Sequence, residues 1–274
     1  MKKTLFWILA IVITLSAAYY QRITGPTYSK TIDVNLDDKT YSFKLKRSST
    51  NDKDCEIKIN ISDTLVSARI NYKLFPVKDD WKSIDFRREG QNLIAYLPKQ
   101  PSAGKLQYYI TVMHKDFPET LTDSENVIIR FKGSVPAWAL VPHIIFMFIA
   151  MLLSNLTGIY AIGRIEKQAF YGKLTLLALF IGGMIFGPIV QDYAFGQAWT
   201  GIPFGWDLTD NKTLIALLFW ILAVSVNWKK QNFKLTILAS IVLFIIYIIP
   251  HSLFGSEFDY AKEEVVTGII TFIF

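Results

Sequence analysis

Long runs of apolar residues occupy the second half of the chain, whereas its first half alternates apolar and polar positions. The apolar runs cover residues 138–162, 174–190, 213–226 and 235–250, and a further run near the amino terminus covers 5–18. A helix that crosses a bilayer needs about 17–25 apolar residues, so the two middle runs need their flanking aromatic residues to span. The run 174–190 has no charged residue, which argues against the buried helices of a soluble core. The pattern predicts four membrane helices and an amino-terminal anchor.

Alternation between residues 30 and 132 predicts half-buried strands rather than helices. The alternating sets lie at 41–45, 55–61, 66–74, 93–97, 106–112 and 127–131, with turn-forming residues such as Glu89-Gly90 between them. Several short strands with one apolar face each predict an antiparallel sandwich of immunoglobulin or fibronectin type III character. The predicted fold class is thus a membrane α-helical bundle, four helices plus an N-terminal anchor, with an inserted all-β domain.

These patterns divide the chain into four parts. Residues 1–20 read as a signal anchor or a cleaved signal peptide, because two lysines precede a short apolar run; its length slightly favours the anchor. Residues 21–135 form the β-domain, and residues 136–254 form the four-helix domain. The tail, 255–274, is too short to span again with its polar first half and is expected to lie in the membrane interface.

Basic residues gather on alternate connections between the apolar runs, which predicts the orientation. The amino terminus and the connections 163–173 and 227–234 carry most of them, namely Lys2, Lys3, Arg164, Lys167, Lys173, Lys229, Lys230 and Lys234. These segments are expected in the cytoplasm. The β-domain, the loop 191–212 and the tail are then expected on the other side.

Charge and composition exclude several classes of protein. The net charge of +6 is concentrated on the predicted cytoplasmic edges, so it does not indicate a nucleic-acid-binding surface. The single cysteine, Cys55, has no partner for an internal disulfide and is expected to be a buried free thiol. Metal-spaced Cys/His clusters, nucleophile elbows and glycine-rich phosphate loops are absent from the sequence, which leans against an enzyme. Charged triplets such as Arg87-Arg88-Glu89 are expected to form exposed turns.

Two Pro-His steps lie near the outer ends of predicted helices. They place His143 and His251 at one membrane depth on one side, and ionisable residues at such positions are functional candidates. Facing imidazoles are the usual axial ligands of a b-type haem. The alternative is that each histidine hydrogen-bonds to headgroups, water or a neighbouring helix, and this alternative is favoured.

The loop 191–212 is dense in glycine and aromatic residues. Part of this pattern fits an aromatic belt at the membrane interface, but the glycine and proline kinks predict a folded, partly re-entrant cap over the outer helix ends. Asp207 or Thr209 is expected to cap a helix beginning near Asp210, and Lys212 to pair with Asp192 or Asp210. The spacing gives little support to calcium, since the glycine and distal glutamate of a calcium loop are missing. The candidate interaction residues are Asp192, Tyr193, Trp199, Trp206, Asp207 and Asp210.

Three segments resemble an uncharacterised family of bacterial polytopic inner-membrane proteins with a periplasmic β-domain. They are 143–155 (HIIFMFIAMLLSN), 187–214 (GPIVQDYAFGQAWTGIPFGWDLTDNKTL) and 249–260 (IPHSLFGSEFDY). The resemblance implies a bacterial inner membrane and a periplasmic place for the β-domain and tail. It carries no established activity, so it transfers no catalytic or binding residue.

Three functions remain open at this stage. The leading one is a membrane-embedded scaffold or accessory subunit, in contact with lipid and with a membrane or periplasmic protein partner. The second is a redox protein, linked to b-haem or quinone, that uses His143 and His251. The third is a small transporter for lipid or an apolar solute, along a groove at Gly183 and Gly187; the spans lack charged residues at mid-depth, which makes this the weakest.

Overall fold

The computed structural model describes residues 2–36, 39–114, 117–120, 126–250 and 255–266. The chain divides into two compact units. A helical unit contains Met1–Pro26 and Val135–Ser256, and a β-rich unit contains Thr27–Ser134 and Glu257–Val266. Each unit is described by itself.

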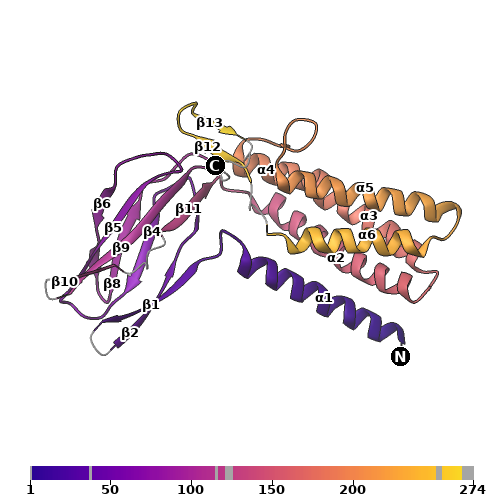
Figure 1. Ribbon diagram of the computed structural model, residues 1–274, viewed down its shortest axis with the longest axis horizontal. Helices are drawn as coiled ribbons and strands as arrows, with labels where there is room; N and C mark the ends of the chain where they lie inside the picture. Colours follow the sequence, from indigo (N-terminus) through magenta and orange to yellow (C-terminus); the bar gives the residue numbers. More distant parts are fainter. Residues whose placement is uncertain (1, 37–38, 115–116, 121–125, 251–254, 267–274) are drawn as a thin grey trace. The chain divides into compact units, whose positions relative to one another are not determined.

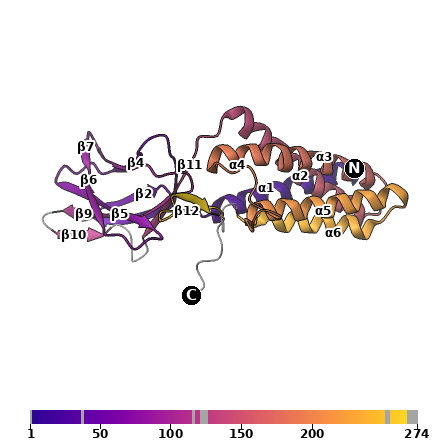
Figure 2. The ribbon, with the colours of Figure 1, turned by 90° about the horizontal axis from the view of Figure 1, so that it is seen from above.

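The helical unit consists of long helical rods (Figures 1 and 2). Its elements are α1 (Lys2–Thr24), α2 (Ala137–Ile162), α3 (Gln168–Leu179), the π-helix η1 (Phe180–Phe186), α4 (Gly187–Phe195), α5 (Leu208–Lys229) and α6 (Phe233–Ile248). Lys3–Thr24, Ala137–Ile162, Gln168–Phe195 and Leu208–Lys229 are each long and apolar enough to cross a membrane, and α6 is a shorter apolar helix. The predicted apolar runs are therefore helices. The spans Gln168–Phe195 and Leu208–Lys229 are longer than the apolar runs inside them, because polar turns extend these helices at their ends.

The third of these spans, Gln168–Phe195, changes its hydrogen-bond pattern partway along. Pro188 has no N–H to donate into the helical ladder, and just before it the ladder widens, with the Gly187 N–H donating to the carbonyl of Gly182 five residues back. A π-segment of this kind interrupts the α-helical repeat without breaking the rod. Sequence analysis marked this place only by its glycines and its proline.

Close packing in the helical unit relies on small residues. Helix α2 packs against α1, α3 and α6, and α5 packs against α3 and α6. Ala150, Ala216 and Ala239 are almost fully buried around Trp220. At Gly183 an added Cβ would lie 2.6 Å from Cγ2 of Thr213, so only glycine lets α5 approach this closely. Thr213 thus fills the space beside Gly183 where a groove was expected.

The strands of the β-rich unit form two main sheets. The first has the order β3-β11-β9-β5-β6 with β10 also paired to β9, and the second has the order β4-β8-β7. All pairs are antiparallel except β3 with β11. The bounds are β3 (Ser48–Thr50), β4 (Cys55–Asn60), β5 (Val66–Phe75), β6 (Lys82–Asp85), β7 (Arg87–Glu89), β8 (Asn92–Leu97), β9 (Lys105–His114), β10 (Phe117–Thr120) and β11 (Val127–Lys132). Two hairpins complete the unit, β1 (Lys30–Leu36) with β2 (Lys39–Leu45), and β12 (Glu257–Asp259) with β13 (Glu264–Val266).

One apolar core joins the two sheets. Strand β4 alternates buried and exposed residues along its whole length, and its buried side chains share a cluster with those of β5, β8, β9 and β11. Tyr108 is buried in this core and its hydroxyl donates to the carbonyl of Lys46 at 2.8 Å. Cys55 is a buried free thiol, as predicted.

The triplet Arg87-Arg88-Glu89 is not an exposed turn, and that prediction is wrong. It forms strand β7, and the Arg88 guanidinium donates to the carbonyls of Ile61, Asp63 and Val66. Ile61 and Asp63 lie on the stretch that links β4 to β5, and Val66 is the first residue of β5. Arg88 therefore holds that stretch against the edge of the second sheet.

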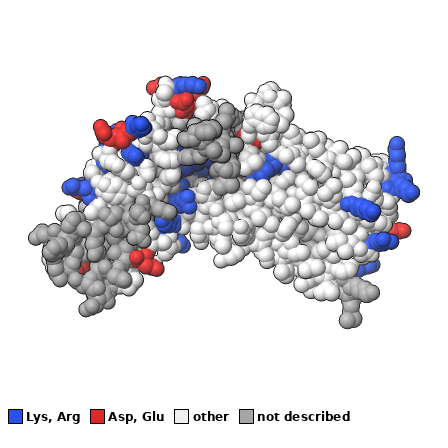
Figure 3. Space-filling view, viewed as in Figure 1, with Lys and Arg blue, Asp and Glu red and all other residues white. Residues whose placement is uncertain are grey.

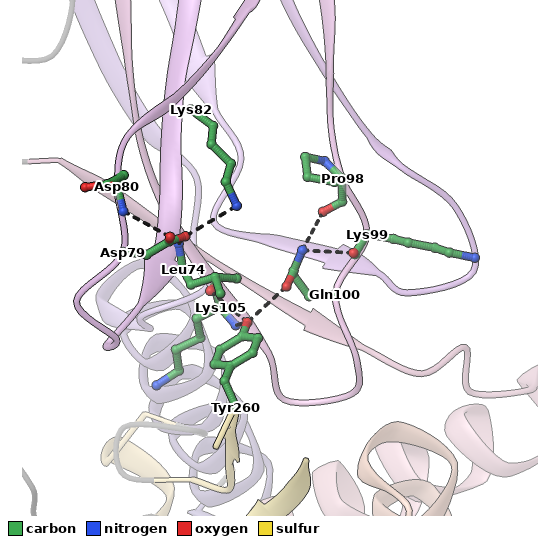
Figure 4. Close-up of polar contacts among 9 residues, drawn as sticks. All are labelled: Leu74, Asp79, Asp80, Lys82, Pro98, Lys99, Gln100, Lys105 and Tyr260. Carbon is green, nitrogen blue, oxygen red and sulfur yellow. Dashed lines mark hydrogen bonds and ion pairs between the residues drawn. The ribbon is translucent and has the colours of Figure 1, made fainter. Parts of the chain in front are cut away.

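The stretch Glu257–Val266 of the tail belongs to the β-rich unit and carries the β12–β13 hairpin, and the interfacial position of the tail stays a prediction. The Tyr260 hydroxyl accepts from the Lys105 N–H at 3.1 Å and lies 3.1 Å from the side-chain oxygen of Gln100 (Figure 4). Lys105 also forms an ion pair with Glu257 in which both side chains are largely buried. These contacts fasten the β12–β13 hairpin to the start of β9.

Candidate functional site

The candidate site is the connection from α4 to α5, residues 196–207, which stands out from the rods as an orange loop in Figure 1. Helix α4 ends at Phe195 because Gly196 adopts φ +76°, a left-handed conformation that glycine allows. Its N–H donates to the carbonyl of Asp192 at 2.7 Å. Helix α5 begins at Leu208, where Asp207 caps it by accepting from the N–H groups of Thr209 and Asp210. This confirms the predicted cap.

The carboxylate of Asp210 organises the loop from within. Its Oδ2 accepts from the Thr200 N–H at 2.6 Å, from the Thr200 hydroxyl at 3.0 Å and from the Gln191 amide at 3.0 Å. Asp210 is only 5% exposed. Hydrogen bonds to a buried charged acceptor are stronger than neutral ones, so this group ties the end of α4 and the middle of the loop to the first turn of α5.

A second contact fixes the turn that follows. The side-chain oxygen of Asn211 accepts from the Ile202 N–H at 2.8 Å. A Cβ on Gly201 would lie 2.7 Å from Cβ of Asp210, so glycine is needed for the loop to press against α5. The loop is thus held by main-chain contacts on its inner side.

Large apolar side chains cover the outer side of the same loop. Phe204 is 81% exposed, Trp206 is 73% exposed and Ile202 is 47% exposed. Trp199 donates its ring N–H to the carbonyl of Ile202 at 3.2 Å, directly behind this tip. We call Ile202, Phe204 and Trp206 the apolar tip. A firmly held loop that leaves such groups exposed is suited to contact with lipid or with another protein.

The predicted interaction residues take different places. Asp207 and Asp210 lie in the inner network, and Trp206 lies on the tip. Tyr193 packs edge-on against Trp138 with ring centroids 6.1 Å apart, and Asp192 is exposed. The predicted set lacks Gln191, Thr200, Gly201 and Asn211, because no local spacing identifies the partners of a buried carboxylate.

Lys212 does not form the predicted pair with Asp192 or Asp210. Its ammonium donates to the carbonyl of Ile249 at 3.1 Å, just beyond the end of α6, and the side chain is 5% exposed. A buried ammonium on a helix-end carbonyl satisfies an acceptor that has no partner in the helix. Lys212 therefore ties α5 to the last turn of α6.

His143 has a protein partner in the structure. Its Nδ1 lies 2.9 Å from the carbonyl of Gly182, the same oxygen that accepts the π-type bond from Gly187. His251 lies outside the described residues. Among the described residues, no group of three or more His, Cys, Asp or Glu side chains is arranged to hold a metal ion.

Comparison with known proteins adds no family to this picture. No protein-family model matches the chain, and no curated protein matches it either.

Proposed function

We propose that this protein is an integral membrane scaffold or accessory subunit that uses the apolar tip to bind another protein of the cell envelope. The observation that carries the proposal is the contrast within the loop 196–207. Buried polar groups fix its inner side through Asp210, while Phe204 and Trp206 stay exposed on its outer side. Rigid exposed aromatic side chains are the groups that most often anchor protein interfaces.

The orientation predicted from the basic residues supports a place for the tip on the outer face. Basic side chains gather at the end of the helical unit where the amino terminus, the 163–167 connection and the start of α6 lie (Figure 3). We call this the basic end. Under the positive-inside rule it faces the cytoplasm. The loop 196–207 is at the opposite end of α5, so it faces the periplasm in a bacterial inner membrane.

The strand order supports an immunoglobulin-like assignment for the β-rich unit, which the proposal places in the periplasm. Strand β3 runs parallel to β11 and begins the order β11-β9-β5-β6. This order corresponds to an A′ strand against the G, F, C and C′ strands, and β4-β8-β7 corresponds to B, E and D. Such modules commonly serve recognition, although the fold alone does not define a function.

The proposal is tested by photo-crosslinking in native membranes. A photoreactive phenylalanine analogue at Phe204 is expected to yield one discrete protein adduct. Trp228 is the matched control, since it is 75% exposed against 81% for Phe204 but lies at the other end of α5. Adducts with lipid alone at position 204, or the same protein adduct from position 228, would contradict the proposal.

A redox function is the second candidate, and the contact of His143 favours it. Histidines that bind metals usually donate their other ring N–H to a carbonyl or carboxylate, and Nδ1 of His143 is placed to donate to Gly182. Nε2 would then be the ligand atom. The test is an absorption spectrum of the detergent-purified protein, oxidised and dithionite-reduced. A Soret band that shifts on reduction and disappears in His143→Ala supports haem, and a spectrum without visible bands excludes it.

A further inference from the structure

A groove of about 280 Å³ opens on the surface of the helical unit between α1, α2 and α6. It is far in sequence from the loop 196–207 and plays no part in the proposed scaffold function. Most of its wall is aliphatic or aromatic. The lining residues are Ile13, Asn155, Gly158, Ile159, Ile162, Ile237, Ser240, Ile241 and Phe244.

The polar groups in this wall are already used by the protein. The amide of Asn155 donates to the Thr14 hydroxyl at 3.0 Å, and the Ser240 hydroxyl donates to the Ser154 carbonyl at 2.8 Å. Both side chains are 7% exposed. A polar ligand would therefore find few donors here, whereas a flexible hydrocarbon chain matches the wall.

The floor of the groove is formed where α2 and α6 meet. A Cβ on Gly158 would lie only 2.4 Å from Oγ of Ser240, so the two helices touch at this point. The aliphatic side chains of Ile159, Ile237 and Ile241 also line the groove. In a bilayer this hollow cannot stay empty, because its walls would lose their dispersion contacts.

Positive charge lies at one end of the groove. Lys234 precedes Ile237 and Ile241 by three and seven residues, so it falls on the same face of α6 as these lining residues. Arg164 lies two residues after Ile162, the last lining residue of α2, and its N–H donates to the carbonyl of Ala161 at 3.1 Å. Both are exposed, and Lys3 of α1 is exposed at the same basic end. Glu166 is the one acidic residue in the adjoining 163–167 connection.

We propose that this groove binds one anionic phospholipid, with an acyl chain between α1, α2 and α6 and the phosphate near Arg164 and Lys234. An apolar wall by itself accepts any lipid, so the basic rim supplies the selectivity. The proposal rests on the assignment of these helices to a membrane and does not require a partner protein.

The test measures lipid retained by the full chain in mild detergent, by native mass spectrometry. The probes are phosphatidylglycerol and phosphatidylcholine with identical acyl chains, added in equal amounts. The wild type is expected to retain one molecule of phosphatidylglycerol in preference to phosphatidylcholine. Ile241→Trp fills the groove and is expected to lose this bound lipid. Ile245→Trp is the control, since Ile245 is 53% exposed against 49% for Ile241 on the same helix and does not line the groove.

Neutral substitutions of the two basic residues test the contribution of charge separately from that of the apolar lining. Arg164→Gln and Lys234→Gln are each expected to lower the preference for phosphatidylglycerol about fivefold while the groove still takes phosphatidylcholine. Equal retention by the two tryptophan variants, unchanged preference in both glutamine variants, or a lipid-free dimer that buries the groove would each overturn the proposal.

If Ile241→Trp loses the wild-type helical circular dichroism, a photoactivatable phosphatidylglycerol applied to the wild type decides instead: crosslinks within α2 or α6 support the site, and crosslinks elsewhere exclude it.

Discussion

The two units of this chain differ in where most of their large apolar side chains lie. In the β-rich unit the large residues Leu97, Ile110 and Phe131 are fully buried. In the helical unit alanine and glycine fill many of the closest contacts, while large residues such as Leu218 and Ile245 are more than half exposed. The first arrangement suits water, where burial of apolar area stabilises the fold. The second suits hydrocarbon, where close backbone approach and hydrogen bonds must hold the helices together.

The largest effect is expected from a cavity in the β-rich core. Phe131→Ala should lower the free energy of unfolding of this unit by about 3–5 kcal/mol, because a fully buried ring leaves a void. Urea unfolding of the full chain, followed by protease resistance of residues 27–134, measures it. Leu218→Ala is the comparison in the helical unit, where little change is expected. A similar loss in both variants would remove the contrast between the units.

Loss of the buried carboxylate in the helical unit should have the next largest effect. Asp210→Ala leaves the Thr200 N–H, the Thr200 hydroxyl and the Gln191 amide without their acceptor, at about 1.5–3 kcal/mol. A spin label at Phe204→Cys should become much more mobile, and the buried Cys55 leaves that label specific. Asp192→Ala, at an exposed carboxylate, should leave the label unchanged. An immobile label in Asp210→Ala would mean that the loop is held in another way.

Tight helix contact can be tested by adding one methyl group and removing another. Gly183→Ala should destabilise the helical unit by about 1–3 kcal/mol, because its Cβ overlaps Cγ2 of Thr213. Thr213→Ser removes that methyl group but keeps the hydroxyl that donates to the Thr209 carbonyl. The double variant should regain most of the lost thermal stability in detergent. If Thr213→Ser gives no rescue, the contact is not what requires glycine.

The smallest effect is expected at the β12–β13 hairpin. Burial raises the pKa of Tyr260 from 10.0 to about 12. Because the folded pKa is the higher one, the stabilisation is complete below pH 10 and is lost as the pH rises towards 12. A spin label at Lys262→Cys should report release of the hairpin in this range. Tyr260→Phe should weaken attachment by about 1 kcal/mol and abolish this pH dependence; a midpoint unaffected by the substitution would assign the release to other groups.

Much of the β-rich unit could be predicted because its signals are local. The alternation in 55–61 and 106–112 marks strands whatever they pair with. Strand β7 was missed because three charged residues show no alternation, and its stability comes from contacts of Arg88 with Ile61, Asp63 and Val66. The hairpin of the tail was not predicted either, because its contacts are with Lys105, which is distant in sequence.

The candidate site divides in the same way. The cap at Asp207 was predicted because a capping residue acts on its own helix, two and three residues away. The partner of Lys212 was wrong because opposite charges nearby in sequence were favoured over the Ile249 carbonyl at the end of another helix. The Thr200 contact of Asp210 also depends on how the loop folds back, which residue type and spacing do not specify.

The π-helix η1 sets the rotational phase of everything that follows it in its rod. Such a segment is equivalent to one extra residue in an α-helix, and each residue advances the helix by about 100°. If Phe180–Phe186 formed a regular α-helix with no residue removed, α4 would be turned by about that angle. Gln191 would then leave the side on which it meets Thr200 and Asp210. The orientation of the loop that displays Phe204 and Trp206 thus depends on an irregularity that lies nine residues before the loop, the length of α4.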